Sequence, residues 1–156
     1  MDVNNLLIQI DNADFLTAEE LAQCKDIDLT NANPQIFIAG LSHDKSVIRF
    51  VSTKILGELK STDAIKQLCH VLIHDEDDDV RWSAAKSLGI IGAQSAIDAM
   101  ITAINDDCYI VRNYAIKGLI AIGGHKAVNA IIHATYSDDY DTQILAQSAL
   151  KQLIKA

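Results

Sequence analysis

The sequence predicts an all-α protein: a right-handed α-solenoid of about four helix pairs with an N-terminal helical cap. One proline and seven glycines among 156 residues leave few helix breaks, and aromatic residues, at 5%, give alternating strand patterns little material. A motif also recurs about every 31 residues, which indicates a repeat architecture. Pairs of short amphipathic helices cannot bury their apolar faces alone, so we expect the repeats to stack around one continuous core.

The recurring motif is centred on Arg49, Arg81, Arg112 and Gln143, which lie 32, 31 and 31 residues apart. Four segments align on these anchors: 44–60, 77–93, 108–124 and 139–155. Each has a small residue three positions after the anchor and a leucine seven after it: Ser52, Ala84, Ala115 and Ala146, then Leu56, Leu88, Leu119 and Leu150. This spacing places both positions on one apolar helix face, where small residues let a neighbouring helix approach.

A second amphipathic stretch precedes each of these segments, so each unit is expected to be a helix, an acidic turn and a second helix. The units are expected over about 33–60, 62–92, 94–123 and 125–156. Pro34 suits the first turn of the first helix, and Gly123 with Gly124 suits a helix end.

Residues 1–32 differ from the repeats. Short helices are expected near 3–10 and 17–24, the second opened by a capping box at residues 17–20. Seven acidic residues against one basic residue, Lys25, give this region about −6 of the net charge of −8. We expect an acidic N-terminal helical cap packed on the first unit, with a partner-docking arm as the alternative.

The pattern Val-Arg-x-x-Ala-x-x-x-Leu-Gly-x-x-Gly, preceded by aspartates, fits best at 78–92 and partly at 44–57 and 108–123. It resembles the short HEAT repeats named after phycobilisome lyases, over about four-fifths of the chain. The resemblance implies an α-solenoid but leaves function open, because such repeats serve bilin lyase subunits, adaptors, inhibitors and regulators alike. The last unit departs from the pattern, with Thr142-Gln143 in place of Val-Arg, as suits a terminal cap.

All three arginines of the protein occupy the same place in the repeat, shortly after aspartates at a helix start. We therefore expect a charge-assisted ladder that holds neighbouring turns together. Its expected members are Arg49, Arg81, Arg112, Asp44, Asp79 and Asp107. The remaining acids of these turns suit helix N-termini, and together they give an acidic edge that would receive a basic partner.

The sequence predicts no catalytic site, cofactor or metal. It contains no glycine-rich phosphate loop or nucleophile elbow. His70 and His74 lie four apart on one helix, but Cys69 falls on the apolar face, turned away from them. The loop at 74–79 lacks the glycine of a calcium loop. The three cysteines, Cys24, Cys69 and Cys108, match no disulfide framework, and we expect them reduced and mostly buried.

The second helices are expected to line the concave side of the solenoid, where a partner would bind. The positions one and five after the anchor should face that side: Phe50, Trp82, Asn113 and Ile144, then Lys54, Lys86, Lys117 and Ser148. Large apolar groups beside a lysine row favour a contact surface. The alternative is that Phe50 and Trp82 pack into the core and the lysines are merely solvated. Trp82 is the first candidate for partner contact, then Phe50, with Tyr109 and Tyr114 weaker.

These observations predict a non-enzymatic protein-binding module, an adaptor or an immunity-type inhibitor, with a neutral or basic protein as its partner. The net charge of −8 and pI near 4.9 disfavour binding to membranes or nucleic acid. No apolar run reaches about 18 residues and the N-terminus is acidic, so we expect a cytoplasmic protein. One alternative is a bilin lyase or bilin-handling subunit, with pigment propionates on Lys54 or Lys86 and rings on Trp82. Another is a nucleic-acid binder using the lysine and arginine rows.

Overall fold

The computed structural model describes residues 29–155, and over this range the chain is helical and contains no strand. Eight α-helices form four antiparallel pairs: α3 (Pro34–Gly40) with α4 (Ser46–Glu58), α5 (Ile65–His74) with α6 (Asp78–Ile91), α7 (Ile97–Ala103) with α8 (Tyr109–Ile122), and α9 (His125–Ala134) with α10 (Tyr140–Lys155). Short 3-10 turns, η2 (Thr62–Ala64) and η3 (Gln94–Ala96), lead into α5 and α7. The predicted all-α solenoid is confirmed.

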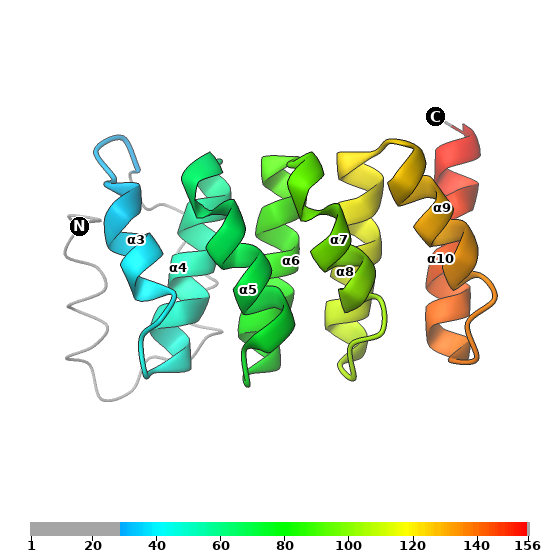
Figure 1. Ribbon diagram of the computed structural model, residues 1–156, viewed down its shortest axis with the longest axis horizontal. Coiled ribbons are helices and arrows are strands. Elements are labelled where there is room, and N and C mark those ends of the chain that lie inside the picture. Colours follow the sequence, from blue (N-terminus) through cyan, green and yellow to red (C-terminus); the bar gives the residue numbers. More distant parts are fainter. Residues whose placement is uncertain (1–28, 156) are drawn as a thin grey trace.

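The four pairs stand in a row along the longest axis, with the first helix of each pair in front of the second (Figure 1). Two layers result, one of α3, α5, α7 and α9 and the other of α4, α6, α8 and α10. The helix pairs fall within the four units expected from the sequence. The expected cap at 1–32 lies outside the described residues except for 29–32, so it stays a prediction. None of the helices in the described range is long and apolar enough to cross a membrane.

Helix boundaries follow from local chemistry. Asn33 accepts a hydrogen bond from the backbone N–H of Gln35 at 3.1 Å and so caps α3, with Pro34 in the first turn. Asp77 caps α6 in the same way, accepting from the N–H of Asp79 at 3.0 Å. The helix ends at Gly92, whose φ of 74° lies in the left-handed region that glycine adopts without strain.

One continuous core runs through the stack between the two layers. The residues of the repeated small position are fully buried, and the first three repeated leucines have no exposed surface: Ser52, Ala84, Ala115 and Ala146, with Leu56, Leu88 and Leu119. Helix α6 packs on both α4 and α8, so the second-helix layer is continuous. Gly57 faces the backbone and hydroxyl of Ser87 with no room for a side chain, which explains how closely α4 and α6 approach.

A small buried polar network also joins α4 to α6. Ser87 Oγ donates to the carbonyl of Thr53 at 2.7 Å, and the hydroxyls of Thr53 and Ser83 share a hydrogen bond at 2.6 Å. Each of these buried polar groups therefore has a partner, which avoids the cost of desolvation and fixes the register of the two helices.

Candidate interaction surface

The first rung of the arginine ladder joins the first unit to the second. The guanidinium of Arg49 holds Asp75 with two hydrogen bonds, Nε to Oδ2 at 2.7 Å and Nη2 to Oδ1 at 2.8 Å. Its Nη1 donates to the carbonyls of His43 and Asp44, both at 2.9 Å, in the turn of its own unit. One buried cation thus satisfies acceptors on two successive turns.

The second rung repeats this arrangement one unit further along. Arg81 holds Asp106 by Nε to Oδ2 at 2.8 Å and Nη2 to Oδ1 at 3.0 Å, and it also contacts Asp107 at 2.7 Å. Its Nη1 donates to the carbonyl of Asp75 at 3.0 Å. The hydrogen bond to Asp106 raises the pKa of Arg81. Burial would raise the pKa of Asp106, but hydrogen bonds from Arg81 and the N–H of Cys108 outweigh it and leave that pKa below its usual value.

The third rung is looser. Arg112 again donates to two carbonyls of its own turn, those of Asp106 and Asp107, both at 2.9 Å. However, its Nη2 lies 3.4 Å from Asp139, a half-exposed carboxylate, and its buried Nε has no hydrogen-bond partner among the described residues. Asp139 Oδ2 accepts instead from the N–H of Thr142 at 2.8 Å.

The carboxylates that the arginines hold differ in part from those expected. Asp107 has the expected place, but Asp44 contributes its carbonyl, and the Asp79 carboxylate accepts from the indole N–H of Trp82 at 2.7 Å. The expected partners differ because each guanidinium points toward the turn of the following helix pair rather than toward the aspartates of its own turn. The carboxylates held there are chiefly Asp75, Asp106 and Asp139, while Glu76 and Asp107 make further contacts with Arg49 and Arg81.

Three aromatic rings from successive units line up on the second-helix layer. Trp82 meets Phe50 edge to face with ring centroids 5.5 Å apart, and it stacks on Tyr114 at 5.2 Å with an interplanar angle of 22°. The bond from the indole to Asp79 fixes the orientation of the ring. The ammonium of Lys117 lies 5.3 Å from the centroid of the Tyr114 ring, which is within cation–π range.

Two hollows adjoin these rings. One, of about 110 Å³, lies between α4 and α6, and the other, of about 290 Å³, lies between α6 and α8. Lys86 and Ile90 line both, so the two hollows are neighbours across α6. We call the pair the second-helix groove, which is lined chiefly by Lys54, Trp82, Lys86, Ile90, Tyr114 and Lys117.

The candidate contact residues are not equally accessible. Phe50 is only 3% exposed, so it supports Trp82 from beneath and offers a partner almost no area, contrary to its expected rank. Trp82, Tyr114 and Lys54 are partly exposed, whereas Lys86 and Lys117 are exposed.

Two further candidates lie away from the groove lining, and one contributor was missed. Asn113 is partly buried. Tyr109 is 46% exposed at the start of α8, with the guanidinium of Arg112 5.8 Å from its ring centroid. Sequence reasoning missed Ile90, which is 42% exposed in the groove. It lies four residues after Lys86 and eight after Trp82, a helical spacing that would have found it.

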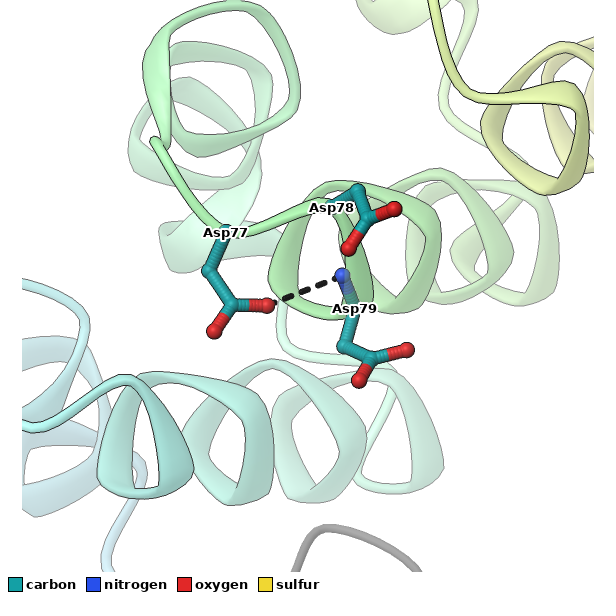
Figure 2. A group of neighbouring side chains, drawn as sticks. All are labelled: Asp77, Asp78 and Asp79. Carbon is teal, nitrogen blue, oxygen red and sulfur yellow. Dashed lines mark hydrogen bonds between the residues drawn. The ribbon is translucent and has the colours of Figure 1, made fainter.

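The acidic edge is formed by the turns within the helix pairs. At its centre, the carboxylates of Asp77, Asp78 and Asp79 have oxygens within 4.8 Å of one another, and Figure 2 shows Asp77 bonded to the N–H of Asp79. These acids lie at the N-terminus of α6, where the helix dipole stabilises negative charge. Cap and dipole therefore account for the cluster structurally.

The chain is thus a helical repeat protein whose arginines bind the stack together and whose aromatic and lysine side chains line a groove. A family model for HEAT repeats matches residues 34–109 and 68–151. These matches cover more than half of the chain, which therefore belongs to the HEAT-repeat family, as the resemblance predicted. A search of curated proteins finds no match to the sequence.

Solved structures show the same fold. The complex of CpcE and CpcF of phycocyanin lyase from Nostoc sp. PCC7120 is 18% identical with a TM-score of 0.56, over 92% of this chain and 70% of that one. Two engineered proteins from the Northeast Structural Genomics Consortium are also similar. One is 20% identical, with a TM-score of 0.57, and the match covers 99% of this chain and 87% of that protein. The other is 17% identical, with a TM-score of 0.58, and the match covers 96% of this chain and 78% of that protein.

Proposed function

We propose that this protein is a non-enzymatic binding module that holds a partner protein on its second-helix groove, as an adaptor or an inhibitor. The observation that carries the proposal is the fixed, partly exposed indole of Trp82, stacked on Tyr114 and held by Asp79. A tryptophan whose rotamer is already set loses little entropy when a partner covers it. Tryptophan and tyrosine are also the residues that most often dominate the free energy of binding.

The arginines and the lysines have different surroundings, and this difference supports the proposal. Arg49 and Arg81 are buried and bound to aspartates and carbonyls of adjoining turns, so they hold the fold together. Lys86 and Lys117, which are exposed in the groove and form no ion pair among the described residues, are placed to meet a partner. The acidic edge, where Glu76 and Asp107 have highly exposed side chains, offers a second contact region for a basic part of the same partner.

The likeness to the phycocyanin lyase complex supports the fold of this chain and no particular chemistry, because the two share 18% identity. Protein association is the property that the repeat architecture favours, since stacked helix pairs present long, continuous surfaces. We therefore assign the groove to a protein rather than to a pigment.

The proposal is tested by affinity capture from native lysate with the wild-type protein and Trp82→Ala, read by quantitative mass spectrometry. We expect at least one protein captured stoichiometrically by the wild type and reduced about tenfold or more by the variant, as for a tryptophan hot spot. The matched control is Tyr136→Ala, which removes an aromatic ring that is 79% exposed in the turn before α10, away from the groove. Thermal unfolding of both variants verifies that the fold is kept.

Two outcomes would count against the proposal. Capture of the same protein by Trp82→Ala and the wild type at equal levels would remove function from the groove. Absence of any stoichiometric partner would remove the binding role itself.

A further inference from the structure

We infer that the second-helix groove receives an acidic segment of its partner, one that carries carboxylates beside an apolar or aromatic side chain. This inference rests on the proposed function for its site and goes further by naming the chemistry of what binds there. Net charge alone predicts a neutral or basic partner instead. The groove is expected to bind a different kind of segment because its local charge, set by Lys86 and Lys117, is positive while the net charge of the protein is −8.

The shape of the groove suits a chain segment lying across the helices. Its two hollows adjoin one another on either side of α6, and Lys86 with Ile90 forms the ridge between them. Gly89 and Gly118 both line the second hollow and contribute no side chains to it, where α6 and α8 lie close together. A side chain at Gly89 would lie 3.0 Å from the Cα of Gly118.

The floor and walls of the groove are apolar and held in place. Trp82 is fixed by its hydrogen bond to Asp79 and by contact with two neighbouring rings, and Tyr114 stacks on that indole and lies within cation–π range of Lys117. Ile90 adds an aliphatic side chain that is 42% exposed. An apolar or aromatic side chain of the partner would bury this surface, which provides the non-directional part of the affinity.

The charge of the groove selects the rest of the segment. Lys86 and Lys117 occupy equivalent positions in successive units, and no carboxylate among the described residues forms an ion pair with either. Within the part of the chain that the structure describes, Glu58 is the one carboxylate that lines the first hollow, no carboxylate lines the second, and Asp79 is hydrogen-bonded to the indole. Carboxylates on the incoming segment complement the two ammonium groups, whereas a basic segment would meet like charge.

A protein segment fits this charge pattern better than nucleic acid does. Phosphate binding depends on many cationic contacts, and here the arginines are used within the fold. The acidic edge also lies at the N-terminal ends of the same second helices, where it would repel a polyanion. A short acidic segment can place its few carboxylates at the lysines and leave that edge free.

The test is selection of a random peptide library displayed on phage against the purified protein. We expect the enriched peptides to combine Asp or Glu with an apolar or aromatic residue. A tryptophan-free synthetic representative is then titrated against the protein, whose only tryptophan, Trp82, reports occupancy of the groove by its fluorescence.

Matched charge reversals give the decisive comparison. Lys86→Glu with Lys117→Glu is expected to weaken the dissociation constant of the peptide roughly tenfold or more, since two attractive contacts become repulsive. Lys60→Glu with Lys66→Glu, at two exposed lysines outside the groove, makes the same change in net charge and should leave binding unchanged. All the altered lysines are exposed, so the fold is expected to persist, and circular dichroism checks it. Ala121→Glu, an exposed change in the second hollow, should weaken binding independently.

The inference is overturned by enrichment of basic peptides, by no enrichment, or by binding that the double reversal leaves intact. Stronger, salt-dependent quenching of Trp82 by a single-stranded oligonucleotide would equally overturn it. Its failure is distinguishable from that of the proposed function. A captured protein that depends on Trp82 but not on the lysines would leave the binding role standing and refute only the acidic segment.

Discussion

Arg81 and Asp106 are joined by two parallel hydrogen bonds, of 2.8 and 3.0 Å, although they belong to successive helix pairs. Both side chains are 11% exposed, so the pair is largely removed from water. Removing one partner of such a pair leaves the other charge poorly solvated, which costs more than the pair itself contributes. The ladder is therefore expected to be unequal in strength, because its third rung lacks this geometry.

The inequality is measurable in alanine variants. Arg81→Ala is expected to lower the free energy of unfolding by about 3 kcal/mol, because it leaves Asp106 without its cation. Arg112→Ala is expected to cost about 1 kcal/mol, because Asp139 is half exposed and 3.4 Å away. Urea denaturation of the two variants beside the wild type provides the comparison, and equal losses would contradict the ranking of the rungs.

The second rung should also make the stability of the fold depend on pH in the acidic range. The pKa of Asp106 is lower in the folded protein than its usual value. Its stabilising contribution is thus complete above the unfolded-state pKa, about 4, and is lost as the pH falls through the lower folded-state value. The melting temperature of the wild type should fall over this range, whereas Asp106→Asn should start lower at neutral pH and decline less. Parallel curves for the two proteins would show that Asp106 is not responsible.

Two helix glycines should respond differently to a methyl group. A Cβ at Gly57 would collide with the backbone and side chain of Ser87, so Gly57→Ala is expected to cost about 1–3 kcal/mol by forcing α4 and α6 apart. A Cβ at Gly118 meets chiefly the flexible end of Met100, 2.7 Å away. Gly118→Ala should therefore stay within about 1 kcal/mol of the wild type, since the gain in helix propensity offsets the adjustment. Chemical denaturation decides, and a larger loss at Gly118 would refute the packing argument.

The thiol of Cys69 should react slowly. Burial raises its pKa, so little of the reactive thiolate is present at neutral pH. Alkylation with iodoacetamide, followed by mass spectrometry of the peptides, should show Cys69 modified much more slowly in the folded protein than after unfolding in urea. Cys69→Ser, which lacks the thiol, identifies the peptide without ambiguity. Equal rates in both states would mean that the side chain is not protected as described.

The buried core was predicted well because apolar residues at helical spacing mark the buried face of each helix. Leu56, Leu88 and Leu119 were placed by spacing alone, and all three have no exposed surface. The limits appear where one unit meets the next. Phe50 and Trp82 occupy the same place in the repeat, and each packs against a ring of the following unit, yet Phe50 is buried while Trp82 remains partly exposed. Position in the repeat therefore does not determine burial.

The candidate site was likewise predicted only in part: the pattern identifies single residues but not their partners in other units. The sequence pattern identifies the arginines as structural, but the aspartates that they hold lie 25 to 27 residues further on, beyond any local period. The lysine row and the aromatic candidates could be named from position. That these side chains line one groove could not be predicted, because the groove depends on how far apart α4, α6 and α8 lie.

The forward reach of each arginine has a consequence for how such a chain can grow. Each of the two middle units accepts a contact from the arginine of its predecessor and offers its own arginine to its successor. A tandem copy of residues 62–92 would therefore bring its own acceptor, Asp75, and its own donor, Arg81. The same copy would carry another indole and another ammonium into the row. Copy number alone can therefore lengthen the surface, without redesign of any unit already in place.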